Sequence, residues 1–289
     1  MYKTINIVFI IILGTMLWAC AGTLEDIPSN NEDVNGFHVT WRSNVTDRQK
    51  DAIREILNNM QFVEGGTFLM GATQEQEPYA RENEKPAHYV QLTDFYIGKY
   101  EISIQQLEAL LGKEFSAYER NHGAPKYTWA DWKMILNLIY EYSGVELDFP
   151  TEAQWEYAAR GGKKSYGYIY PGWYSISSLE DHENELGLVD MARNHSEWCK
   201  DAFNRYSGLP LECNPYYVQG LGHIIRGGNE KSIEKLKNYF STSSSKNKFS
   251  SIYKDVRNCR VSARSYADNS HDYLGIYISC RFTFNIKQK

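Results

Sequence analysis

The chain has 289 residues, of which 42% are hydrophobic and 14% aromatic, and its formal net charge at pH 7 is −5. This length and composition are sufficient for a packed core, which excludes a disordered chain. The weak negative charge provides no broad basic field, so we expect no nucleic-acid partner. The 22 tyrosines and 21 glycines favour a fold with short strands and many turns over a helical bundle.

The first twenty residues, MYKTINIVFIIILGTMLWAC, have the pattern of an export signal. One lysine precedes an apolar run, and small residues then lead to Cys20. The ending LWAC resembles the recognition sequence of bacterial lipoproteins, which predicts a signal peptide over residues 1–19 and a lipid on Cys20. Cleavage by an ordinary signal peptidase is the alternative. Residues 20–45 begin with an acidic, turn-rich stretch, and we expect them to form a tether.

Four segments combine a helix start signal with apolar residues at helical spacing. In the first of them, Thr46 and Gln49 have the spacing of a capping box, and Ser103 and Gln106 repeat this arrangement in the second. We interpret each apolar stripe as a surface that faces the core. The predicted helices are residues 46–60, 103–114, 128–144 and 151–162.

Strand signals are short and lie between these helices without a regular alternation. The predicted strand segments are residues 62–71, which include a Gly-Gly bend, 88–101, 222–228, 258–265 and 275–286. We find no repeat with a period of 20 to 50 residues. Separate strands and helices without βαβ units predict an α+β fold.

After Cys20, the chain contains Cys199, Cys213, Cys259 and Cys280. In an exported protein these four cysteines meet an oxidising compartment, where a disulfide between at least two of them is expected. Three pairings are open. A free reactive thiol is the alternative.

Six segments match, in order, successive signatures of one family. They are FVEGGTFLMG, FYIGKYEIS, FPTEAQWEYAARGG, NELGLVDMARNHSEWCKD, IIRGG and CRVSAR, and they extend over about residues 61 to 284. In these segments the chain resembles the formylglycine-generating enzyme, or sulfatase-modifying factor, family. The resemblance implies the family's variant of the C-type lectin fold, with small antiparallel sheets and much irregular chain. It divides the mature protein into an N-terminal helix, 46–60, and a sulfatase-modifying-factor-like domain, 61–289.

The stretch DMARNHSEWCKD resembles the family segment that wraps a calcium ion. The resemblance implies that Asp190 and Glu197 provide side-chain oxygens, which are hard donors suited to calcium. It implies that Arg193 and His195 provide backbone carbonyls. Arg193 stands where the family has glycine, so the turn there departs from the family pattern. An ordinary surface segment without an ion is the alternative to a calcium cofactor.

Formylglycine-generating enzymes oxidise a substrate cysteine with two of their own cysteines, which hold copper(I). Two soft thiolates suit copper(I), and one does not suffice. Counting from either flanking motif places the pair at Phe249 and Lys254, or at Ser232 and Lys237. Neither register contains a thiol, so we expect no copper and no family catalysis.

The resemblance also assigns the remaining cysteines. Cys259 takes the place of a structural cysteine beside RVSAR, and Cys280 stands at an aromatic position of the last strand. This favours a disulfide between Cys259 and Cys280, or between Cys199 and Cys259, over a catalytic thiol.

We therefore expect a non-catalytic protein of the bacterial cell envelope that is anchored to a membrane by its lipid. We expect this membrane to be the outer membrane, with the domain on its periplasmic face or on the cell surface. Its domain would bind or hold an envelope protein or a polysaccharide. One alternative is a divergent cysteine-oxidising enzyme that uses Cys259 with Cys199 or Cys280. Another is a lectin-like protein with a diversified C-terminal surface, based on RSYADNSHDYLGIY. The aromatic candidates for a partner surface are Tyr239, Phe240, Tyr253, Tyr266 and Tyr273.

Overall fold

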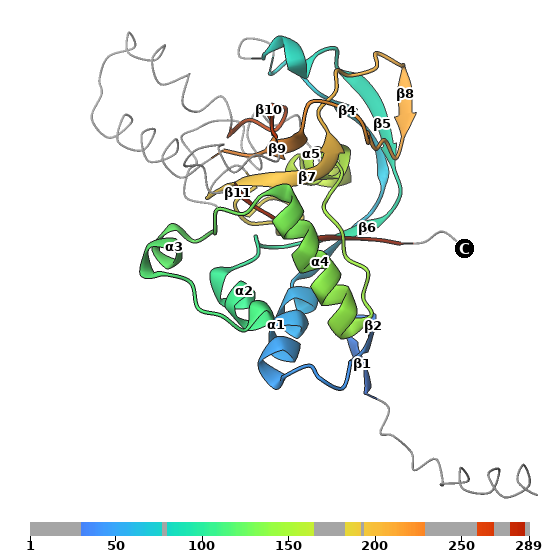
Figure 1. Cartoon of the computed structure of the whole chain (residues 1–289). Coiled ribbons are helices and arrows are strands. Elements are labelled where there is room, and N and C mark those ends of the chain that lie inside the picture. The colour runs from blue at the N-terminus through green and yellow to red at the C-terminus, as the bar shows by residue number, and fades with distance from the viewer. Residues whose placement is uncertain are drawn as a thin grey trace, which may run out of the picture.

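The computed structural model describes residues 30–76, 80–164, 183–191, 194–228, 259–268 and 278–286. Within these ranges the chain forms short helices and small sheets joined by much irregular chain, as Figure 1 shows. The α+β prediction is confirmed. No helix among these residues is long and apolar enough to span a membrane.

The helices begin with capping boxes, in which a Ser or Thr side chain and the side chain three residues later each bond the other residue's backbone. The α-helices are α1 (Asp47–Asn58), α2 (Ile104–Leu111), α3 (Ala117–His122), α4 (Trp129–Ser143) and α5 (Glu152–Ala159). Four of them confirm the predicted helices. The sequence reading missed α3, although Ser116 and Glu119 have the same spacing as the other boxes.

The expected tether 20–45 is wrong in its second half. Residues 31–40 form an antiparallel hairpin of β1 (Asn31–Val34) and β2 (Phe37–Thr40). Asn35 and Gly36 form its two-residue turn with φ angles of 51° and 82°, a conformation that an Asn-Gly pair adopts with little strain. Val34, Phe37 and Val39 are buried, so hydrophobic burial outweighs the acidic composition of this stretch.

Besides this hairpin, the strands of the described residues form three small sheets. One has the order β12-β6-β3, formed by β12 (Thr283–Asn285), β6 (Phe95–Gly98) and β3 (Met60–Val63). A second has the order β4-β5-β8, formed by β4 (Gly66–Met70), β5 (His88–Leu92) and β8 (Leu211–Cys213). The third has the order β10-β9-β7-β11, formed by β10 (Arg264–Ala267), β9 (His223–Arg226), β7 (Ser196–Ala202) and β11 (Ile278–Ser279). Two 3-10 helices, η1 (Glu82–Glu84) and η2 (Gly162–Lys164), complete the elements described.

The predicted strand segments are confirmed in part. Segment 258–265 enters a strand only at Arg264, because residues 259–263 form a turn. Segment 275–286 contributes two short strands with a break between them. The sequence reading missed β7 and β8.

Two apolar clusters form the core. The first joins α1, α2 and α4 to the N-terminal hairpin, which makes the predicted N-terminal helix part of the domain. The second surrounds α5 and the strands β4 and β5. Trp132 lies in the first cluster and Trp155 in the second, both fully buried, as expected from their helical stripes. Figure 1 shows the helices of the first cluster below the sheets.

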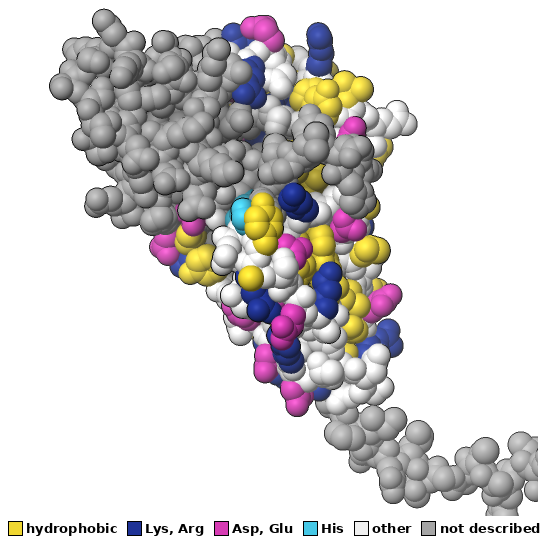
Figure 2. Space-filling model, turned by 60° about the vertical axis from the view of Figure 1, so that its left-hand side comes forward, with side chains coloured by type: hydrophobic (Ala, Val, Ile, Leu, Met, Phe, Trp, Pro, Cys, Tyr) yellow, Lys and Arg dark blue, Asp and Glu magenta, His cyan; other side chains and the backbone are white. Residues whose placement is uncertain are grey.

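Charges of both signs are mixed on the surface. On the face shown in Figure 2, Lys and Arg side chains alternate with Asp and Glu over the described part of the molecule. That part of the face carries no extended basic field, in agreement with the composition.

Candidate functional site

The segment predicted to wrap calcium leads into β7, where Glu197 is fully buried. Arg281 donates hydrogen bonds from Nε to Oε2 of this carboxylate at 2.7 Å and from Nη2 to Oε1 at 2.6 Å. Trp155 Nε1 donates a third, at 2.9 Å, to Oε2. Burial disfavours the charged guanidinium, but the carboxylate outweighs burial and the pKa of Arg281 is raised. Glu197 is therefore one half of a buried, bidentate ion pair.

Arg281 uses its remaining donors on backbone carbonyls. Nη1 donates to the oxygens of Gly98 and Lys99, each at 3.0 Å, and Nη2 donates to the oxygen of Val189 at 3.1 Å. One side chain thus links the end of β6, the chain before residue 190 and β7. All five guanidinium N–H groups have an acceptor in this arrangement.

Calcium is the metal that the family resemblance implies here. Both oxygens of Glu197 already accept hydrogen bonds, so an ion would have to displace Arg281 from them. Asp190 lies in a left-handed turn with φ of 58°, and Arg193 lies outside the described residues. In the part of the chain that is described, no three His, Cys, Asp or Glu side chains form a cluster that could hold a metal. As they are arranged, the described side chains do not fit a calcium site, and the calcium that the resemblance implies stays a prediction that requires Arg281 to move.

His195 was expected to provide a backbone carbonyl to a calcium ion. Its imidazole ring bonds two other residues of the domain. Its Nδ1 lies 2.8 Å from Oε2 of Glu101, and its Nε2 lies 2.6 Å from the carbonyl oxygen of His122. Asn194 Nδ2 also donates to Glu101, at 2.9 Å. A carbonyl oxygen only accepts hydrogen bonds, so Nε2 carries a proton. The ring therefore joins the end of α3 to the start of β7.

The arginines of the signatures IIRGG and CRVSAR form ion pairs in the interior. Arg260 bonds Glu84 at 2.8 and 2.6 Å, and neither residue is exposed. Arg264 bonds both oxygens of Glu152, at 2.7 and 2.6 Å. Arg226 pairs with Glu156 and donates to the carbonyl of Ala263 at 2.6 Å. These signature residues therefore maintain the fold. The sequence reading missed their carboxylate partners, which lie 70 to 176 residues away.

The expected disulfides are not formed, and none of the four described cysteines is in a disulfide. Cys199 lies in the second apolar cluster, Cys280 lies in the first, and Cys259 belongs to neither. Burial raises the pKa of the Cys199 and Cys280 thiols well above the usual value. Cys259 is also buried, and Cys213 is exposed on β8. This corrects the predicted pairings 259–280 and 199–259.

The predicted partner surface is described only at Tyr266. This tyrosine is 36% exposed, and its ring lies 4.5 Å from that of Phe203. Tyr239, Phe240, Tyr253 and Tyr273 lie outside the described residues, as do Cys20 and the four positions counted for the copper-binding pair.

Comparison with known families identifies the family to which the chain belongs. The profile of the sulfatase-modifying factor enzyme 1-like domain matches residues 44–182 and 174–267, which is more than half of the chain. The chain belongs to this family. The prediction made from the six signatures is thereby confirmed, and the matched region begins before α1, in agreement with the packing of that helix.

Among characterised relatives of this sulfatase-modifying-factor-like protein is the chaperone protein LppX of Paenibacillus barcinonensis. It is 25% identical over 210 residues, which cover 50% of this chain and 71% of LppX. The formylglycine-generating enzyme of Streptomyces coelicolor is 29% identical over 138 residues, 38% of this chain and 42% of that enzyme. The solved structure of Treponema denticola variable protein 1 superposes with a TM-score of 0.57 at 15% identity, covering 88% of this chain and 98% of that one. At this identity the superposition shows the fold alone, which is the fold expected.

Proposed function

We propose that this protein is a non-catalytic binding or scaffold module of the bacterial cell envelope, held at a membrane by a lipid on Cys20. The observation that carries the proposal is that the protein has no cysteine at the positions where the family has its copper-binding pair. The family fold and its signature arginines are present, and these arginines form buried ion pairs, whereas neither register counted for the copper-binding pair contains a cysteine.

The cysteines that remain do not replace the missing pair. A soft metal binds thiolates, and a thiol whose pKa is raised by burial stays protonated at neutral pH. Cys199 and Cys280 are both in this condition, and they lie in different apolar clusters. Cys213 is exposed, and its thiol donates to Oε1 of Gln91 at 3.6 Å. Cys259 is buried as well, so the four described cysteines include one exposed thiol, which is insufficient for a two-thiolate clamp.

The anchoring half of the proposal rests on the N-terminal sequence. If Cys20 is the lipid-bearing first residue of the mature protein, ten residue steps separate it from residue 30, where the described structure begins. A chain of that length spans at most about 35 Å. The domain would therefore lie next to the membrane, with its N-terminal hairpin facing it.

A peptide oxidation assay tests the absence of catalysis. Purified full-length protein is loaded with copper(I) and incubated with a cysteine-containing sulfatase peptide, with a formylglycine-generating enzyme as positive control. We expect no aldehyde product. Copper-dependent product that disappears in Cys199→Ser or Cys280→Ser would contradict the proposal.

Lipid attachment is tested separately in a bacterial host supplied with a labelled fatty acid. We expect label on the wild-type protein and on Cys213→Ser, and none on Cys20→Ser. Label that persists in Cys20→Ser, or is absent from the wild type, would remove the anchor from the proposal.

A further inference from the structure

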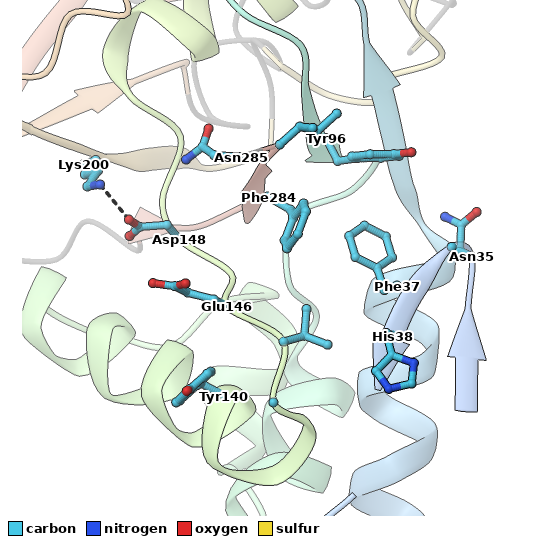
Figure 3. Close-up of a pocket in the computed structure, with 14 residues that line it drawn as sticks. Asn35, Phe37, His38, Tyr96, Tyr140, Glu146, Asp148, Lys200, Phe284 and Asn285 are labelled. Carbon is cyan, nitrogen blue, oxygen red and sulfur yellow. Dashed lines mark ion pairs between the residues drawn. The ribbon is translucent and has the colours of Figure 1, made fainter. Parts of the chain in front are cut away.

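A cavity lies between the N-terminal hairpin, the end of α4 and β12 (Figure 3). Its volume of about 660 Å³ is in the range of ligand sites in proteins. The cavity opens where two neighbouring segments of the chain separate, one around Thr283 and the other around Asp148. Thr283 and Asp148 bond each other's backbone at 2.7 and 2.9 Å, and the segments then diverge toward Asn285 and Glu146.

Aromatic rings form one wall of this cavity. The ring centroids of Phe37 and Tyr96 are 5.2 Å apart, and those of Phe37 and Phe284 are 5.0 Å apart, each pair in an edge-to-face arrangement. These contacts hold the rings in place, since edge-to-face packing is favourable. Tyr140 of α4 also lines the cavity, on the side of Glu146 (Figure 3), and is 53% exposed. This wall can pack against apolar C–H groups of a ligand.

Polar groups form the opposite wall, as Figure 3 shows. Lys200 Nζ of β7 lies 2.8 Å from Oδ2 of Asp148, and Glu146, two residues before Asp148, lies beside this pair. Asn285 accepts a hydrogen bond from Gln154 at 2.6 Å through Oδ1, which turns its amide nitrogen away from that partner. The wall therefore offers both donors and acceptors.

The backbone of β12 adds two more polar groups to this wall. Thr283 bonds Asp148, and the next residue, Phe284, is paired with Tyr96 of β6. Backbone groups alternate in direction along an antiparallel strand. The N–H and C=O of Asn285 therefore point away from β6, toward the side on which the cavity opens.

The geometry points to a binding site for a neutral saccharide that contains N-acetylhexosamine. A sugar ring presents C–H groups on its faces and hydroxyls around its edge, which matches an aromatic wall opposite a polar wall. The acetamido group adds a methyl group for the rings and an amide that can pair with Glu146 and Asn285.

The charges of the lining select against charged ligands. Lys200 is already paired with Asp148, so the lining offers an anion no cation beyond that pair and His38, which is itself 3.3 Å from Asp33. The polar wall is also unsuited to a purely apolar ligand, because a lipid chain would displace water from these polar groups without offering them hydrogen bonds.

Calorimetric titration of the mature full-length protein, in a detergent without a sugar headgroup, tests this site. The probe is the trimer of N-acetylglucosamine, compared with the glucosamine trimer and maltotriose. We expect saturable binding of the acetylated trimer and weaker binding of the other two. Tyr140→Ala and Glu146→Gln should each raise Kd roughly tenfold, the effect of losing one contact of about 1.4 kcal/mol.

Matched substitutions outside the cavity serve as controls. Tyr118→Ala removes an exposed helical tyrosine, and Glu141→Gln removes an exposed carboxylate of α4, so both should leave Kd unchanged. Tyr140 and Glu146 are exposed, and an unchanged melting temperature verifies that their variants fold. Failure of the acetylated trimer to bind, tighter binding of the glucosamine trimer, or equal Kd in pocket and control variants would overturn the inference. The inference rests on the proposed binding function, and its failure would leave the results on lipid attachment and peptide oxidation unchanged, so the two can be distinguished.

Discussion

Replacing Arg281 by lysine tests whether the buried ion pair with Glu197 maintains the fold. Arg281 makes five hydrogen bonds, and neither side chain is exposed. Lysine retains the charge but has three donors on a single nitrogen, so at least two buried acceptors lose their partner. At about 1 to 3 kcal/mol for each unsatisfied group, the expected loss is roughly 2 to 6 kcal/mol. Breaking other buried ion pairs costs a similar amount, about 3 to 5 kcal/mol.

Urea unfolding of the wild type and Arg281→Lys, with the free energy of unfolding extrapolated to water, measures this loss. Arg54→Lys is the matched control, because Arg54 bonds Glu32 in the same bidentate way at 2.7 and 2.8 Å but both side chains are about one-third exposed. We expect the control to lose no more than about 1 kcal/mol. If Arg281→Lys falls within 1 kcal/mol of the wild type, or loses no more than the control, the reasoning about this ion pair is wrong.

Three further results are expected. In the native protein an alkylating reagent should modify Cys213 rapidly and Cys199 and Cys280 only after denaturation, because burial raises the pKa of the latter two; rapid native labelling of either would contradict the structure. Burial raises the pKa of Asp201 to about 7, so the folded state holds a proton that the unfolded state loses, and this group's contribution to stability is lost as pH rises from about 4 to 7. Asp201→Asn should therefore make the fall in unfolding free energy between pH 5 and pH 7 smaller, and an unchanged slope would refute the assignment. The melting temperature should be equal in excess calcium and in excess chelator, because Arg281 occupies Glu197; a rise with calcium would show that this segment rearranges to bind the ion.

The helices could be predicted from the sequence because their signals are local. A capping box and an apolar stripe lie within a few residues of each other, and they correctly indicated α1, α2, α4 and α5. Helix α3 carries the capping box without a stripe, since none of its residues is buried, and was missed for that reason. The hairpin was missed because the acidic composition of its surroundings obscured the Asn-Gly turn.

Strand β7 shows why other features could not be found. Five of its seven residues are buried, among them Glu197 and Asp201, so it has neither an alternating nor an apolar pattern. Burial of Glu197 is stabilised by Arg281, which lies 84 residues away in the sequence. Spacing along the chain contains no information about such a partner. The cavity beside β12 could not be predicted either, because its lining comes from the hairpin, β6, α4, β7 and β12.

The signature arginines show that motifs of the family can be retained for the stability of the fold, independently of the family's reaction. Arg226, Arg260 and Arg264 each pair with a buried carboxylate, as Arg281 does outside the six signatures, and removing one partner would leave a charge without compensation inside the protein. A member of the family therefore has a physical reason to retain these motifs whether or not it catalyses the family reaction, whereas a missing thiol leaves no buried charge behind. The motifs that identify the family consequently say little about its reaction in this chain. Evidence about function has to come from groups that the fold does not need, such as Cys20, Tyr140 and Glu146.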